Sequence, residues 1–185
     1  RRRTVAVRLV LPLERPVEIA EARVDVGERV RRDVRVRHAR LQFGQDGLRR
    51  MYVNNENKIY YLTLYNENLM MPEMPKGVED GIKHGIYRFK KSGSKGNAKA
   101  HLIGSGVIIN QVLEAADILE KEGVSTDIWS ATSWSELYRD AVACDRWNLL
   151  HPGEKEKVPY IQEALKGEEG VFVSANDWVK LTAGQ

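Results

Sequence analysis

Residues 100–131, AHLIGSGVIINQVLEAADILEKEGVSTDIWSA, decide the fold. The apolar run at 100–103 predicts a buried strand, and Gly104-Ser105-Gly106 predicts the turn that follows it. Gly123 stands where a helix would end, and residues 127–131 predict a second strand. Between the strands, apolar residues at helical spacing predict one face of a helix: Ile109, Val112, Leu113, Ala116 and Leu119. This order indicates two parallel strands joined by a crossover helix.

The pattern continues toward the C-terminus with two helices. Ser133 or Ser135 is expected to cap the first, which carries Glu136 in its first turn and runs to about Cys144. Residues 159–165 predict the second, shorter helix.

A third strand is predicted at residues 170–174, and Asn176 or Asp177 is expected to cap a last helix. The fold class is therefore α/β, with a mostly parallel sheet that carries helices on both faces. Three strands are few for such a layer, so we expect the sheet to be truncated.

Upstream, residues 41–52 predict the end of a helix and residues 59–65 a buried strand. A short helix at 77–85 and a strand at 86–89 follow, before the polar segment KKSGSKGNAK at 90–99. Because this segment is rich in Gly, Ser and Lys, it predicts a linker. The expected domains are residues 1–40, 41–92 and 93–185.

The charge distribution separates an N-terminal head from the rest of the chain. Residues 1–50 hold 14 Arg, no Lys and 7 acidic residues, whereas residues 51–185 hold 3 Arg, 12 Lys and 19 acidic residues. Residues 1–40, the head, alternate Val with Arg, and Gly27 predicts a hairpin turn between strands.

Three interpretations of the head stay open. Clustered Arg is typical of an arm that binds nucleic acid. Residues 24–30, VDVGERV, are similar to a lipoyl-type hairpin, although the head has no lysine to modify. The third hypothesis is that the head is not native sequence, because out-of-frame translation of GC-rich DNA yields this Arg-rich, Lys-free composition.

The composition of the chain indicates in which cellular compartment the protein is expected. No run of 18 apolar residues predicts a membrane span, and no apolar segment with a cleavage site follows the basic N-terminus. Cys144 is a single cysteine and cannot form an internal disulfide, so a cytoplasmic, reducing location is expected.

Two motifs invite a cofactor interpretation. Gly104-Ser105-Gly106, between a strand and a helix, could hold a phosphate at helical amides, but it lacks the remaining residues of a dinucleotide or P-loop motif. A tight turn is the favoured interpretation. Asp46-Gly47 with Asn54-Asn55 is faintly similar to the magnesium signature of thiamine diphosphate enzymes, but its spacing is too short, and we reject it.

The single histidine, cysteine and tryptophan residues do not predict a functional site. The histidines His38, His84, His101 and His151 show no metal-ligand spacing, so no zinc site is predicted. Cys144 would need His151 as the partner of a nucleophile, and a buried thiol is favoured. The four tryptophans are expected in the core or at an interface: Trp129, Trp134, Trp147 and Trp178. The predicted site residues are therefore none, whether catalytic, cofactor-binding or metal-binding.

Longer motifs resemble a known family from about Gln45 to the end of the chain. They are DGLRRMY (46–52), YYLTLYNEN (60–68), MPEMP (71–75), GIKHGIY (81–87), LIGSG (102–106) and DRWNLLHP (145–152). In this order they resemble the homodimeric bacterial pyruvate dehydrogenases, the thiamine-dependent, decarboxylating first components of that complex.

The resemblance implies a transketolase-like enzyme of three α/β domains. Residues 41–92 would end its pyrimidine-binding domain, and residues 93–185 would begin its C-terminal domain. That family decarboxylates pyruvate on thiamine diphosphate with Mg²⁺ and passes the acetyl group to a lipoyl-bearing acyltransferase. Its catalytic residues lie in upstream segments, so the resemblance implies a scaffold and dimer contact that is inactive and binds no cofactor by itself.

Two alternatives stay open at this point. One is a non-catalytic interaction module with a nucleic-acid-binding head. The other is a different thiamine-dependent, transketolase-like enzyme, although Asn66-Glu67-Asn68 and the MPEMP motif argue against it.

Overall fold

The computed structural model describes residues 5–8, 37–64, 69–94 and 96–184. The chain forms two compact units, Arg1–Met70 and Met71–Gln185. The hairpin predicted around Gly27, and with it the nucleic-acid and lipoyl-type interpretations of the head, lies outside the described residues.

The first unit pairs a strand of the head with a strand of the body. Strand β1, Val5–Arg8, runs antiparallel to β2, Tyr61–Leu64, with Val5 opposite Leu64. Helix α1, Arg37–Leu48, continues as a π-helical segment, η2, Arg49–Val53. The helix end and the strand that the sequence predicts are both confirmed, but the strand is shorter than expected and is not buried, since Ile59 is 83% and Tyr61 65% exposed.

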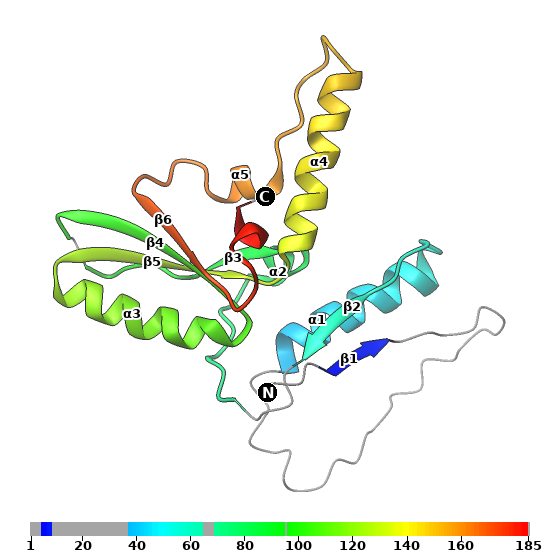
Figure 1. Ribbon diagram of the computed structural model, residues 1–185. Coiled ribbons are helices and arrows are strands. Elements are labelled where there is room, and N and C mark those ends of the chain that lie inside the picture. The colour runs from blue at the N-terminus through cyan, green and yellow to red at the C-terminus, as the bar shows by residue number, and fades with distance from the viewer. Residues whose placement is uncertain (1–4, 9–36, 65–68, 95, 185) are drawn as a thin grey trace, which may run out of the picture. The chain divides into compact units, whose positions relative to one another are not determined.

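The second unit is built on a four-stranded mixed sheet in the order β3-β5-β4-β6 (Figure 1). Its strands are β3 (Ile86–Lys90), β4 (Ala98–Ser105), β5 (Val124–Ala131) and β6 (Val171–Ala175). Strand β4 is parallel to both β5 and β6, and β3 is antiparallel to β5. The mostly parallel α/β sheet predicted from the sequence is confirmed.

Helices cover both faces of this sheet. The helices of the second unit are α2 (Glu79–His84), η3 (Gly106–Ile108), α3 (Ile109–Lys121), α4 (Trp134–Leu150), α5 (Tyr160–Ala164) and η4 (Lys180–Ala183). Figure 1 shows α3 on one face and α4 and α5 on the other. In the described part of the chain, no helix is long and apolar enough to cross a membrane.

Each face has its own apolar cluster, because alternate residues of a strand point to opposite faces. On the α3 face, Leu102 and Ile128 pack with Ile109, Val112 and Ala116. The cluster on the other face consists of Ile86, Ile103, Trp129, Ala131 and Leu137, against which α5 packs. These two clusters form the core of the unit.

Gly104 permits the close approach of α3 to the sheet. A Cβ atom at this position would lie 3.1 Å from the Cα of Ile109 and 3.1 Å from a methyl group of Val112. The glycine of the predicted turn therefore serves helix packing. Gly123, with φ of +81°, ends α3 as expected, since only glycine adopts this conformation at little cost.

Three details differ from the expectations. Helix α4 is capped by Ser133, whose Oγ accepts a hydrogen bond from Glu136 N (3.2 Å), but it continues to Leu150. The expected last helix is a 3₁₀ segment, η4, and Asn176 instead accepts a hydrogen bond from Trp178 N (2.8 Å). Strand β3 joins the same sheet as β4, so the expected linker lies inside the second compact unit.

Candidate functional site: a charged cluster on the sheet

His101 and Asp127 form the centre of a polar cluster on the α5 face of the sheet. They lie directly opposite each other on the neighbouring strands β4 and β5. Both side chains are almost completely buried, with 0% and 1% of their surface exposed. Because they alternate with Leu102 and Ile128, they share the face of Ile103 and Trp129. Two ionisable groups are thus buried side by side.

The hydrogen bonds of His101 define its protonation state. Trp129 Nε1–H donates to Nδ1 (3.3 Å), and an indole N–H can only donate. Nε2 donates to the carbonyl oxygen of Glu169 (3.1 Å), which can only accept. The imidazole is therefore neutral and carries its proton on Nε2. Phe172 stacks on the ring, with centroids 4.4 Å apart.

Lys99 joins the two carboxylates of the cluster. Its Nζ lies 3.3 Å from Asp127 Oδ2 and 3.0 Å from Glu168 Oε2. Arg88 forms a second ion pair with Glu168, and its guanidinium lies 4.6 Å from the centre of the Trp129 ring. The other Asp127 oxygen accepts a hydrogen bond from Ser92 N (2.9 Å).

The pKa shifts follow from these contacts. The hydrogen bond from Lys99 lowers the pKa of the Glu168 carboxyl, and Arg88 lowers it further. The same hydrogen bond to Glu168 raises the pKa of Lys99, with an added contribution from Asp127. Both groups are therefore held in their charged forms around neutral pH.

His101, Asp127 and Glu168 also have the composition of a metal site. One ligand atom from each lies within 4.8 Å of the others. However, Lys99 Nζ already occupies the space between the two carboxylates, and Arg88 adds a second positive charge. Two cations balance two anions around a neutral imidazole whose nitrogens are both hydrogen-bonded. This arrangement fits a closed cluster of ion pairs better than a metal centre. We call this cluster, formed by Arg88, Lys99, His101, Asp127 and Glu168, the clamp.

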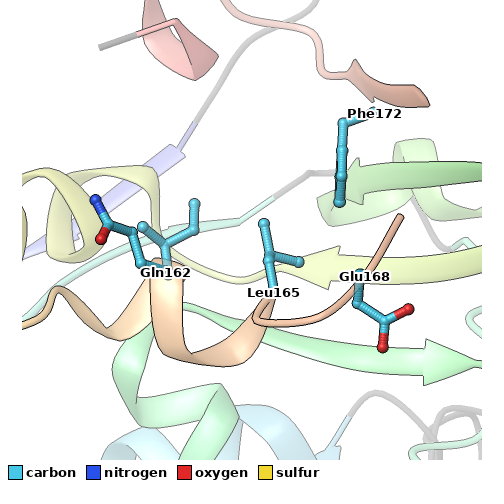
Figure 2. Close-up of a pocket in the computed structure, with 5 residues that line it drawn as sticks. Gln162, Leu165, Glu168 and Phe172 are labelled. Atoms are coloured by element: carbon cyan, nitrogen blue, oxygen red, sulfur yellow. The ribbon is translucent and has the colours of Figure 1, made fainter. Parts of the chain in front are cut away.

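The clamp holds the α5–β6 connection on the sheet. Glu168 and Glu169 belong to that connection, and they bind β3, β4 and the His101 ring. A shallow depression of about 390 Å³ lies beside it, lined by Ile161, Gln162, Leu165, Glu168 and Phe172. In Figure 2, Leu165 lies between Gln162 and Phe172.

Sequence reasoning did not identify this cluster. His101 and Asp127 are polar residues inside two otherwise apolar strands, and that signal could have drawn attention to them. Their pairing depends on strand register. The approach of Arg88 and Glu168 depends on β3 and on a connection that lies far along the chain.

The turn motif is explained by packing. Gly104 and Ser105 are the last residues of β4 and Gly106 begins η3, so the motif forms the junction of strand and helix; Ser105 Oγ is buried and has no hydrogen-bond partner among the described residues. Asp46 of α1 accepts a hydrogen bond from the hydroxyl of Tyr60, the residue before β2 (2.7 Å). Both observations agree with the structural interpretations of these motifs.

The structure keeps the remaining candidates apart from the cluster. Burial raises the pKa of the Cys144 thiol, and Asp140 raises it further, which opposes formation of a nucleophilic thiolate. His151 donates a hydrogen bond from Nδ1 to the backbone carbonyl oxygen of Trp147 (2.8 Å), and its imidazole stacks on the indole ring of Trp147. His84 bonds the carbonyl oxygen of Asp80. That the chain has no catalytic, cofactor-binding or metal-binding residue stays a prediction.

The second unit belongs to a known class of domain. Residues 85–185 match the family model of the transketolase-like TK C-terminal domain, and the chain belongs to that family. The match begins at residue 85 and so includes β3.

The chain is homologous to the C-terminal region of bacterial pyruvate dehydrogenase E1 components. It is 49% identical to those of Buchnera aphidicola (subsp. Acyrthosiphon pisum) and Escherichia coli K12 over 143 residues, and 41% identical to that of Pseudomonas aeruginosa over 142 residues. Each alignment covers 76% of this chain but only 16% of the relative's length. The resemblance inferred from the motifs is confirmed.

Proposed function

We propose that this chain is part of a pyruvate dehydrogenase E1 enzyme and contributes scaffold to it. The similarity to E1 components along three quarters of the chain carries this proposal. Such an enzyme would decarboxylate pyruvate with thiamine diphosphate and Mg²⁺, and would transfer the acetyl group to a lipoyl-bearing dihydrolipoyl acetyltransferase. A cytoplasmic homodimer is part of the same proposal.

The charged cluster supports a scaffold role. Its ionic groups are paired with one another, and the His101 nitrogens are both engaged. We place the start of the C-terminal domain near residue 85, where the family match begins just ahead of β3, and the end of a pyrimidine-binding domain before it, so that the boundary lies earlier than the expected position between residues 92 and 93. The cofactor would then be held by segments that this chain does not contain.

A chimeric enzyme tests the function. Residues 45–185 would replace the aligned segment of the Escherichia coli E1 component, and acetyl transfer to a lipoyl domain would be measured. We expect activity within about tenfold of the parent, which corresponds to a change of about 1.4 kcal/mol or less in the activation barrier, because the replaced segment would contribute packing and no reacting group. A chimera that folds and binds thiamine diphosphate but does not decarboxylate pyruvate would contradict the proposal.

Calorimetry with the isolated chain tests whether this chain itself binds the cofactor. We expect no heat of binding when thiamine diphosphate and Mg²⁺ are added to the 185-residue chain. Binding at micromolar concentrations would show that the chain contributes cofactor ligands, and would refute the scaffold role.

A further inference from the structure

Residues 167–170, GEEG, lie between α5 and β6, and we call this segment the strap. The strap has no apolar side chain, and all of its residues except Glu168 are exposed. Polar contacts hold it on the sheet. Glu168 forms ion pairs with Arg88 and Lys99, and the carbonyl oxygen of Glu169 accepts a hydrogen bond from His101 Nε2 (3.1 Å). Hydrophobic burial therefore contributes little to keeping the strap in place.

Glycine stands at each end of the strap. Gly167 has φ of +76° and Gly170 has φ of +129°, which residues with a side chain rarely adopt. Hinges that absorb large changes in backbone angle are often small residues at the ends of structural elements. A Cβ atom at Gly170 would lie 2.5 Å from the carbonyl oxygen of Lys99, so the strap lies directly on β4. Two glycine hinges therefore flank the two glutamates.

The chain on either side of the strap has contacts of its own. Before it, Ile161 and Leu165 pack against the apolar cluster on the α5 face of the sheet. After it, β6 pairs with β4 along its length, and Phe172 stacks on the His101 ring. Segments with few buried apolar contacts open at a lower free energy than the rest of a structure. Both flanks can therefore stay in place while the residues between them move.

We propose that the strap opens as a local unit while the sheet stays folded, and that it controls access to the buried imidazole of His101. Opening breaks both ion pairs of Glu168 and removes the Glu169 carbonyl oxygen from His101 Nε2. The His101 side chain is completely buried when the strap is closed, and opening makes its Nε2 edge accessible to small solutes. The charge of Glu168 sets how often the strap opens, because both ion pairs depend on it.

The experiment is acylation of the histidines of the 185-residue chain by diethyl pyrocarbonate at pH 7, followed residue by residue by mass spectrometry. The reagent attacks an accessible, unprotonated imidazole nitrogen, so His101 reacts only while the strap is open. His84 is exposed and serves as the internal reference. We expect His101 to react at least about fivefold faster in Glu168→Gln than in the wild-type chain, with the His84 rate unchanged. Glu169→Gln is the matched control and should leave the His101 rate unchanged, because Glu169 contacts the ring through its backbone.

The urea dependence of this reaction separates local opening from unfolding of the whole unit. Local opening exposes little surface, so the His101 rate should hardly change at urea concentrations below the unfolding transition. Cys144 is buried in α4, and labelling of its thiol reports on global unfolding. The Cys144 rate should rise steeply with urea over the same range, because global unfolding exposes much more surface.

Three results would overturn the proposal. A His101 rate that rises with urea as steeply as the Cys144 rate would mean that only global unfolding exposes the imidazole. A His101 rate that Glu168→Gln does not raise, or that Glu169→Gln raises equally, would mean that the Glu168 charge does not hold the strap. A His101 that reacts as fast as His84 in the wild-type chain would mean that the strap is not closed. None of these outcomes bears on the proposed function, which the enzyme assays above test separately.

Discussion

The substitution Glu168→Gln tests whether the charged cluster stabilises the sheet. It preserves the size of the side chain but removes the charge that pairs with both Lys99 and Arg88. The Glu168 side chain is only 15% exposed, so solvent screens these contacts incompletely. Losing charge-assisted hydrogen bonds in such a position should lower the free energy of unfolding by about 1–3 kcal/mol. Lys99 would then keep its ion pair with Asp127, and Arg88 would lose its ion pair with Glu168.

Urea unfolding at pH 7, followed by tryptophan fluorescence, measures this change. All four tryptophans lie in the second compact unit, so their fluorescence reports on the unit that contains the cluster. Glu169→Gln is the matched control, because Glu169 contacts His101 through its backbone carbonyl. We expect the control to change stability by less than about 0.5 kcal/mol, as exposed substitutions usually do.

The pH dependence gives the same test a second readout. The folded-state pKa of Glu168 is lowered, so its contribution is present above the unfolded pKa, about 4.3, and is lost as pH falls through the folded value. The wild-type chain should therefore lose more stability than Glu168→Gln between about pH 5 and pH 3. Equal stability of Glu168→Gln and Glu169→Gln at pH 7 would refute the clamp.

Three further predictions concern single sites. Gly104→Ala should destabilise the second unit by about 1–3 kcal/mol in the same urea experiment, since its Cβ would press on Ile109; unchanged stability would contradict this packing. Burial and the hydrogen bond to Asp46 raise the pKa of Tyr60 to about 12, so stability of the first unit should fall as pH rises above about 10. Burial also raises the pKa of Tyr87 and of Tyr160, so ultraviolet titration should show that Tyr60→Phe removes one of several late-ionising tyrosines, and an unchanged number in that variant would count against the assignment. The Cys144 thiol should react with a disulfide reagent at pH 7 only after unfolding, whereas rapid labelling of the folded chain would disprove its burial.

Local patterns predicted the crossover unit of this fold well. The apolar run of β4, the helical spacing of α3 and the glycine at position 123 each act within a few residues. Ser133 likewise caps α4 through a contact only three residues away. Such features can be predicted from the sequence because the interacting groups are close neighbours along the chain.

Sheet membership was harder to predict. The segment 90–99 has the composition of a linker, yet it joins β3 and β4 of one sheet. Strand β3 pairs antiparallel with β5, about forty residues away, through backbone groups that every residue carries. Composition therefore shows where a strand forms but not which strand it pairs with.

The sequence by itself determined the order of elements, the α/β class and the family, because these depend on local periodicity and on contiguous motifs. Only the tertiary structure decided that His101 and Asp127 lie opposite each other and that Lys99 and Arg88 neutralise the carboxylates beside them. Strand register and sheet order bring together residues up to about eighty positions apart in the sequence. A short-range sequence pattern cannot predict contacts between residues so far apart.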